Sequence, residues 1–259
     1  PIDELFKKYS ELDNELLINL CNVIKTTKEN KHDNAEVSSP YELLNIMCDR
    51  IDANYFIDDS PKVLDYSCGK GNIIIVIFLK YYDSIISHCK DEIEACKIVS
   101  RNIYYADIND INVYITHYKL VKICELLTKK KNIKYQSNSY VGDSLNMNIK
   151  KEWDITGFDL VFVNPPFEDK VNRNITPHKL WIDFTMKTFT EWLKKDGYLY
   201  QISPSSFSSP SSKILELFRN KNIKEIHFNQ EEYFKDVSIS IAWYIIQNNE
   251  NKEETNIND

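Results

Sequence analysis

The residues best suited to chemistry are four in a row, Asn164, Pro165, Pro166 and Phe167, which follow an apolar run. Neither proline can donate a strand hydrogen bond, and a residue before proline avoids helical geometry, so a strand must end at Asn164. The loop then presents two acceptors, the amide oxygen of Asn164 and the backbone oxygen of Pro165, beside an aromatic ring. This combination suits recognition of a planar amino group. The alternative is a strand terminator with Phe167 in the core.

Three acidic residues also stand where strands are expected to end: Asp65, Asp107 and Asp143. Taken singly, each is better explained by a loop carboxylate that caps a helix. Together with Asn164 they form a series at successive strand ends. Because right-handed crossovers bring such ends to one edge of a parallel sheet, the series predicts a ligand cleft at that edge.

Only five glycines occur in 259 residues, and two of them lie in the turn Ser67-Cys68-Gly69-Lys70-Gly71. Glycine lets the backbone approach a ligand closely, and the N-terminus of the helix expected next favours a carboxylate. A strand, a glycine loop and a helix open a nucleotide-type α/β unit. The third glycine of a dinucleotide site is missing, which disfavours an NAD-dependent enzyme.

Apolar runs and helical periodicity predict the elements that would position these residues. Strands are expected at 62–66, 102–106, 135–141, 160–163, 197–202, 223–229 and 238–247. Helices are expected within 3–28 and at 39–50, 73–88, 91–100, 111–128, 178–195 and 213–220. The helix at 39–50 would begin with Ser39 as its N-cap and Pro40 as its first residue.

The order of these elements predicts an α/β fold with a seven-stranded, mostly parallel sheet and helices on both faces. Five early strands alternate with helices, and two strands follow late in the chain. The connection between the last two strands leaves no room for a crossover helix, so the last strand should run antiparallel.

Together the motifs resemble the S-adenosylmethionine-dependent amino-methyltransferases, and most closely the adenine-N6 DNA methyltransferases of restriction–modification systems. The resemblance runs from about Val37 to Gln247. Its order, with cofactor motifs before Asn-Pro-Pro-Phe, is the gamma arrangement, similar to the modification subunits of type I systems. The glycine loop and Asn-Pro-Pro-Phe are specific signals, whereas Ser39-Pro40 and Phe234 match weakly. The resemblance implies a Rossmann-like methyltransferase fold.

The resemblance also assigns two sets of site residues. The catalytic set is Asn164, Pro165, Pro166 and Phe167. The S-adenosylmethionine set is Ser39, Pro40, Asp65, Ser67, Cys68, Gly69, Gly71, Asp107, Ile108, Asp143, Ser144 and Asn164. In this assignment Asp65 holds the ammonium of the cofactor, Asp107 its ribose hydroxyls, Ile108 one face of its adenine and Asp143 its amino group. No metal is expected.

The acceptor stays open among three classes. The nitrogen of an adenine amino group is conjugated with its ring, and Asn164 with Pro165 would draw its two hydrogens out of that conjugation, while Phe167 stacks on an extruded base. RNA adenine methyltransferases share the motif. Protein-glutamine methyltransferases share Asn-Pro-Pro but usually carry tyrosine next. Phe167 therefore favours DNA without deciding the question.

Charged residues after the motif have two interpretations each. His178 is either a general base or the start of the helix that follows Pro177. Lys170, Arg173 and Lys179 form either a basic rim beside the target base or a solvated loop.

Composition restricts the partners and the compartment. The formal net charge of −7 argues against a surface built wholly to grip a phosphate backbone. Six cysteines without metal-ligand spacing indicate a reducing compartment. No apolar run has membrane length, so a soluble protein is expected, cytoplasmic or, if encoded by a phage or virus, inside its host.

Three segments are expected: an N-terminal helical segment at 1–36, the methyltransferase catalytic domain at 37–247 and a charged, disordered tail at 248–259. The sequence after Gln247 is too short for a target-recognition domain. DNA is the expected partner, with a separate specificity subunit or a fused recognition domain supplying further contacts. The alternative is a binding subunit that is active only with such a partner.

Overall fold

The computed structural model describes residues 4, 39–58, 60–131, 135–168, 179–234, 238–250 and 255–258. These residues fall into two compact units. The first contains Pro40–Met147, and the second contains Ser39 and Asn148–Asp259. Except for Glu4, the N-terminal segment expected at 1–36 lies outside the described residues.

Three parallel strands form the sheet of the first unit, in the order β3-β2-β1. They are β1 (Val63–Asp65), β2 (Ile103–Asp107) and β3 (Asn138–Val141). All three fall within or beside the stretches predicted from the apolar runs, although β3 begins three residues later. Asp65 pairs with Tyr105, and Asp107 pairs with Val141. The carboxyl ends of the three strands therefore share one edge, as the sequence predicts.

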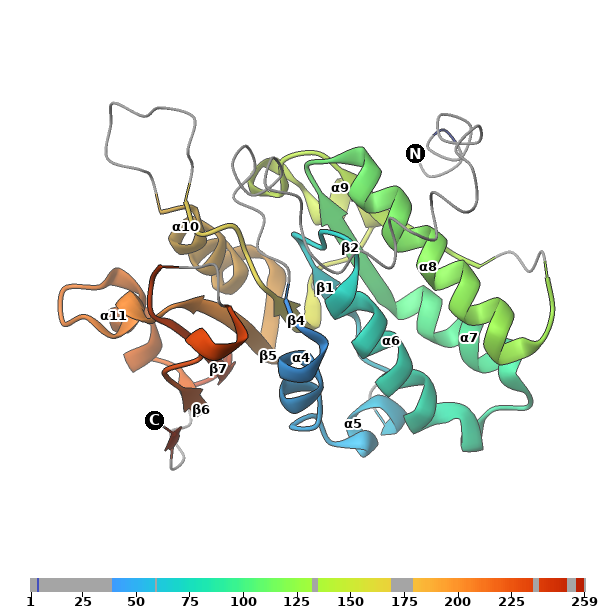
Figure 1. Cartoon of the computed structure of the whole chain (residues 1–259), viewed down its shortest axis with the longest axis horizontal. Coiled ribbons are helices and arrows are strands. Elements are labelled where there is room, and N and C mark those ends of the chain that lie inside the picture. Colours follow the sequence, from blue (N-terminus) through green and yellow to red (C-terminus); the bar gives the residue numbers. More distant parts are fainter. Residues whose placement is uncertain are drawn as a thin grey trace. The chain divides into compact units, whose positions relative to one another are not determined.

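Five α-helices accompany these strands among the described residues of the first unit. They are α4 (Tyr41–Cys48), α5 (Ala53–Asp58), α6 (Asn72–Ile85), α7 (Glu92–Asn102) and α8 (Asp110–Thr128). A 3-10 turn, η1 (Ile86–His88), extends α6, and another, η2 (Ser144–Asn146), follows β3. Helices α6, α7 and α8 pack side by side (Figure 1), and α6 and α8 also contact β2. Buried apolar residues of α6, such as Ile74, Ile77 and Phe78, form much of this core.

The start of α4 differs from the sequence prediction. Pro40 is the N-cap, with extended backbone, and it has no side-chain capping bond among the described residues. Ser39 is therefore not the capping residue, and its hydroxyl is used elsewhere. The short helix α5 was also not predicted, because its six residues are too few to show a clear helical period.

Five strands of the second unit follow the order β4-β5-β7-β6-β8. They are β4 (Phe158–Val163), β5 (Leu193–Pro204), β6 (Asn222–His227), β7 (Ile241–Gln247) and β8 (Asn256–Asn258). Strands β4 and β5 are parallel, and β7 runs antiparallel to both β5 and β6. The predicted antiparallel last strand is confirmed in β7.

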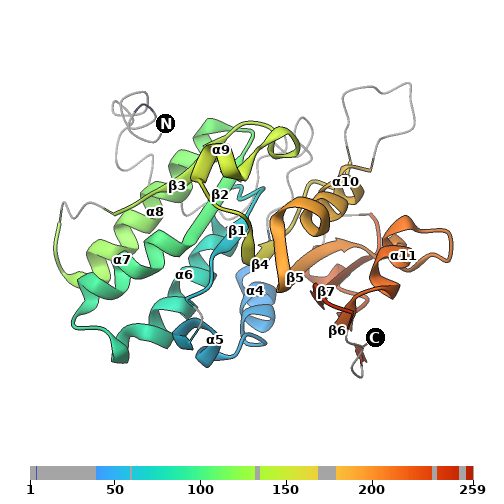
Figure 2. The same ribbon diagram turned by 180° about the vertical axis from the view of Figure 1, so that it is seen from behind.

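The second unit also contains three α-helices among its described residues. They are α9 (Ile149–Trp153), α10 (Leu180–Lys187) and α11 (Lys213–Arg219). Helix α10 continues as a π-helical turn, η3 (Thr188–Trp192), and 3-10 turns lie at η4 (Ser205–Ser208) and η5 (Glu231–Tyr233). Helices α10 and α11 pack against each other (Figure 2). Because β5 already begins at Leu193, the helix predicted to reach 195 ends earlier.

The fold is α/β, with mostly parallel strands and an antiparallel β7, as the sequence predicts. One expectation is wrong in part. Within the tail predicted to be disordered, Asn256–Asn258 forms an eighth strand, β8, parallel to β6. Among the described helices, none combines the length and apolar character needed to cross a lipid bilayer.

Candidate functional site

The glycine loop after β1 has a backbone that only glycine adopts easily. Gly69 and Gly71 both have positive φ, 49° and 84°. A Cβ atom on Gly71 would lie 2.8 Å from Thr116 Oγ1, closer than real Cβ contacts. Gly71 is also the N-cap of α6, and among the described residues no side-chain capping bond is made at this position. The first backbone N–H groups of this 14-residue helix therefore lie at the glycine loop. An anionic group binds favourably at such a helix N-terminus.

Two buried carboxylates flank the loop. Asp65, at the end of β1, is 1% exposed, and its Oδ1 accepts a hydrogen bond from the Ser67 backbone N–H at 3.1 Å. Its Oδ2 is buried and finds no partner among the residues that the structure describes. Burial raises the pKa of Asp65 to about 8, with a smaller contribution from the negative charge of Asp107. A buried carboxylate with an unused oxygen is suited to a cationic ligand group.

Asp107, at the end of β2, already has several protein partners. Its Oδ2 accepts from the Gly69 N–H at 2.9 Å, and its Oδ1 accepts from the Asn109 N–H at 2.8 Å and from Asn112 Nδ2 at 3.2 Å. Burial raises its pKa, and these hydrogen bonds oppose that shift. Asp107 therefore holds the glycine loop in shape. The exposed side chain of the next residue, Ile108, is 65% accessible, which leaves an apolar surface beside the loop.

One face of α8 supports the glycine loop, and sequence reasoning missed it. Asn112 donates to Asp107, Thr116 Oγ1 donates to the Gly69 carbonyl at 3.2 Å, and Lys119 Nζ donates to the Lys70 carbonyl at 2.8 Å. Asn112 and Thr116 are buried, at 3% and 0% exposed. Polar residues spaced by four and three positions on a helix share one face, and that spacing was the available signal.

The loop after β3 contributes Ser144, which contacts the glycine loop, and Asp143, whose described contacts lie within its own turn. Ser144 Oγ donates to the Tyr66 carbonyl at 2.7 Å, which fixes the start of the glycine loop. Asp143 is exposed and caps η2, with Oδ1 accepting from the Leu145 N–H and Oδ2 from Asn146 Nδ2. Its described contacts match the helix-cap alternative. A role toward a cofactor stays a prediction.

In the second unit, β4 ends at Val163 and the Asn-Pro-Pro-Phe loop follows. The Nδ2 of Asn164 donates to Ser39 Oγ at 3.0 Å, and Ser39 is 6% exposed. Phe167 is 7% exposed, so a stacking partner would reach only a small part of its ring. Since Nδ2 is directed to Ser39, the carbonyl end of the Asn164 amide is directed away from it. The structure thus brings Asn164 and Ser39 together.

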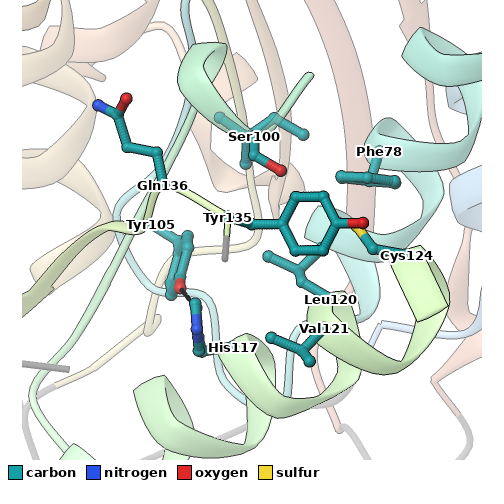
Figure 3. Close-up of a pocket in the computed structure, with 10 residues that line it drawn as sticks. Phe78, Ser100, Tyr105, His117, Leu120, Val121, Cys124, Tyr135 and Gln136 are labelled. Carbon is teal, nitrogen blue, oxygen red and sulfur yellow. Dashed lines mark hydrogen bonds between the residues drawn. The ribbon is translucent and has the colours of Figure 1, made fainter. Parts of the chain in front are cut away.

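A pocket lies elsewhere in the first unit, between α6, α8 and β2 (Figure 3). In it the hydroxyl of Tyr105 forms a hydrogen bond with His117 Nδ1 at 2.9 Å. Its volume of about 10 Å³ accommodates about one water molecule. It is therefore too small for a nucleotide or a base, and it contains none of the site residues predicted from the sequence.

Two further predictions concern metals and the basic rim. Within the described ranges, no three His, Cys, Asp or Glu side chains are grouped so that they could hold a metal ion. Lys170, Arg173 and His178 lie outside the described residues, so both interpretations of them stay open. Lys179 is described and stands at the N-terminus of α10 without a side-chain capping bond.

The sequence matches the model of the Eco57I restriction-modification methylase family over residues 101–239, which is more than half of the chain. The chain belongs to this family. The match includes Asp107, Asp143 and the Asn-Pro-Pro-Phe loop of this Eco57I-family methylase. No curated protein matches its sequence.

Solved structures share the fold of this Eco57I-family methylase at low sequence identity. A modification subunit assigned to a type I restriction enzyme from Vibrio vulnificus YJ016 is 15% identical, with a TM-score of 0.60, over 94% of this chain and 51% of that chain. A protein assigned to the class I S-adenosylmethionine-dependent methyltransferases from Listeria monocytogenes is 13% identical, with a TM-score of 0.58, over 96% and 73%.

The type IIL restriction-modification enzyme MmeI, solved in complex with DNA, is 11% identical, with a TM-score of 0.57, over 95% of this chain and 42% of that chain. The Eco57I-family methylase thus spans about half the length of the Vibrio subunit and less than half of MmeI. These similarities support the Rossmann-like methyltransferase fold that the sequence motifs imply.

Proposed function

We propose that this restriction-modification methylase transfers a methyl group from S-adenosylmethionine to the N6 amino group of adenine in DNA. The observation that carries the proposal is that a hydrogen bond holds the side-chain amide of Asn164 in one orientation. It follows a buried strand, precedes two prolines, and has its Nδ2 bound to Ser39 at 3.0 Å. An amide fixed in this way offers its carbonyl oxygen as a directed acceptor for a substrate N–H group.

The first unit has the features that S-adenosylmethionine would need. The buried Oδ2 of Asp65, which has no partner among the described residues, suits the ammonium of the methionine part, and the N-terminus of α6 suits its carboxylate. The exposed Ile108 would cover a face of the cofactor's adenine. Asp107 would bind the ribose through the oxygen lone pairs that its three donors leave available. When bound, the cofactor supplies a methyl group on a positively charged sulfur.

The chain's own residues would make the acceptor nitrogen reactive. The lone pair of an adenine N6 is delocalised into the ring, so the nitrogen is a weak nucleophile. Asn164 Oδ1 and the Pro165 carbonyl would accept its two hydrogens and favour a tetrahedral nitrogen. Its lone pair would then form the bond to the methyl carbon in line as the carbon–sulfur bond breaks, which would leave a neutral thioether, and the nitrogen would release one N–H proton to solvent. Catalysis of this kind rests on positioning and on preorganised acceptors. Phe167 would contact the ring of an extruded base.

The test is incubation of the full chain with labelled S-adenosylmethionine and adenine-containing DNA, followed by nucleoside analysis. N6-methyladenine is expected, and Asn164→Ala should lower its formation at least about 100-fold while cofactor binding stays within about twofold, because the acceptor acts mainly in the transition state. Asn220→Ala is the matched control, since Asn220 is an exposed residue after α11. Wild-type transfer to RNA adenine or to a glutamine peptide, but not to DNA, would overturn the proposed acceptor.

We also propose that the methylase works with a specificity subunit or a recognition domain. Two observations favour this. The chain spans about half of the Vibrio modification subunit, and its formal charge of −7 is unlike the positive surfaces that bind specific DNA. Native mass spectrometry with and without DNA tests it. Tight, sequence-specific DNA binding by the isolated chain would contradict it.

A further inference from the structure

The hydroxyl of Ser39 binds the Asn164 side chain across 125 residues of sequence. The motif resemblance assigns Ser39 to the cofactor, and the helix pattern assigns it to the N-cap of α4. The cap belongs instead to Pro40, which has no side-chain capping bond. Ser39 Oγ lies 3.0 Å from Asn164 Nδ2, and only 6% of Ser39 is exposed. The contact is therefore largely shielded from solvent.

An asparagine amide has two chemically different ends of nearly the same shape. Its oxygen accepts hydrogen bonds, and its nitrogen donates two. If the amide turned over, an N–H group would face the amino group of a substrate, and two donors would oppose each other. Proline backbone geometry fixes where the side chain of Asn164 starts, but it does not choose between the two ends. A local acceptor for Nδ2 does make that choice.

We propose that Ser39 is a positioning residue for methyl transfer: by accepting from Nδ2, it holds the Asn164 carbonyl oxygen toward the acceptor nitrogen. The inference rests on the proposed function and adds a residue to its chemistry. Ser39 then has a different role from Asp65 and the glycine loop: they would bind the cofactor, whereas Ser39 acts on the reacting amino group through Asn164. Removal of the Ser39 hydroxyl should slow the methyl-transfer step and leave the affinity for S-adenosylmethionine unchanged.

A comparison of Asn164 with aspartate isolates the orientation effect. The two oxygens of a carboxylate are equivalent, so an aspartate at 164 presents an acceptor whichever way it turns. Ser39→Ala should therefore lower the single-turnover rate of the Asn164 protein about 3- to 10-fold, the range for one net hydrogen bond. In the Asn164→Asp background, the same substitution should change the rate less than about twofold. A merely structural serine would slow both backgrounds equally.

The experiment measures four proteins, the wild type, Ser39→Ala, Asn164→Asp and the double variant, for single-turnover methyl transfer to DNA and for S-adenosylmethionine affinity by calorimetry. Ser39→Thr is the conservative variant and should restore the rate, because it keeps the hydroxyl. The inference is overturned if Ser39→Ala weakens cofactor binding with an unchanged single-turnover rate, or if it slows both backgrounds alike.

A second measurement does not depend on activity. In ¹⁵N-labelled protein, the side-chain NH₂ signals of Asn164 are assigned by their loss in Asn164→Asp. Their exchange with solvent should be at least about threefold faster in Ser39→Ala and near the wild-type rate in Ser39→Thr. If the wild type transfers no methyl group, the proposed function fails, and this exchange still decides whether Ser39 holds the amide. Unchanged exchange in Ser39→Ala overturns the inference.

Discussion

Asp65 and Asp107 are close enough for the charge of one to affect the other, yet the protein uses them differently. Asp107 accepts from Gly69, Asn109 and Asn112, so its carboxylate is part of the loop's framework. Asp65 keeps one buried oxygen without a described partner. Such an arrangement costs stability in the free protein and becomes favourable when a cation arrives. We interpret Asp65 as a residue whose burial lowers the stability of the free protein, and we expect binding of a cationic ligand group to offset that loss.

This interpretation predicts a pH-dependent stability. Burial raises the pKa of Asp65 from 3.8 to about 8. Between these values the folded chain keeps a proton that the unfolded chain releases, so the stability due to Asp65 is complete at low pH and falls as pH rises toward 8. Asp65→Asn has no such proton. The free energy of unfolding of Asp65→Asn minus that of wild type should therefore increase with pH, by up to about 1.4 kcal/mol per pH unit across that window.

Urea denaturation at pH 5, 6, 7 and 8 checks this expectation. Asp143→Asn is the matched control, because it removes an exposed carboxylate from a neighbouring loop. A difference between Asp65→Asn and wild type that stays constant from pH 5 to 8 would refute the buried-acid interpretation.

Helices and strands were the most predictable part of the chain. Apolar runs such as Phe158–Val163, ended by prolines or glycines, identify strands because both the side-chain pattern and the turn chemistry are local. The short helices α5 and α9 were missed, since five or six residues contain too little periodicity. The turn from α10 into β5 was misplaced because pairing with β4, rather than propensity, decides where β5 begins.

The candidate site was predictable only where its signal is local in sequence. The glycine loop and the Asn-Pro-Pro-Phe loop can be recognised from their local amino-acid composition. The bond between Ser39 and Asn164 does not, because it joins positions 125 residues apart. The same limit hid Thr116, whose contact with Gly71 is set by the packing of α8 beside α6.

That packing gives a prediction for Gly71→Ala. The new methyl group would lie 2.8 Å from Thr116 Oγ1, and alanine resists a φ of 84°. We expect the free energy of unfolding to fall by about 2–4 kcal/mol. Adding Thr116→Ala should remove the two closest contacts, with Oγ1 and Cγ2 at 2.8 and 2.9 Å, and keep the Cβ contact at 3.1 Å and the backbone cost of about 1–2 kcal/mol. The double variant should therefore be less destabilised than the sum of the single ones. Chemical denaturation of the four proteins measures this, and strict additivity would contradict it.

The whole chain has a net negative charge, and it spans about half the length of the Vibrio modification subunit. A net charge of −7 repels a phosphate backbone over the Debye length. Recognition of a DNA sequence needs a large, positive and well-hydrated interface. We therefore propose that catalytic chemistry and affinity for DNA are separable, and that only the first belongs to these residues.

The expected affinity follows from this separation. Fluorescence anisotropy with labelled duplexes should give a Kd for the isolated chain no tighter than about 10⁻⁶ to 10⁻⁴ M at physiological salt, the range of non-specific binding. The affinity should weaken as salt rises and should differ little between unrelated sequences. A nanomolar Kd for one sequence would show that this chain contains its own recognition surface.

The short strand β8 has a consequence for how the protein behaves in concentrated solution. Asn256–Asn258 pairs with Glu225–His227 of β6, and the Phe228 N–H donates to the Asn258 carbonyl at 2.9 Å. Without these residues, that side of β6 would offer open N–H and C=O groups to another copy of the chain. These three exposed residues, two asparagines on either side of Ile257, thus cover that side of β6 against edge-to-edge aggregation. A preparation trimmed before Thr255 should be the one that self-associates.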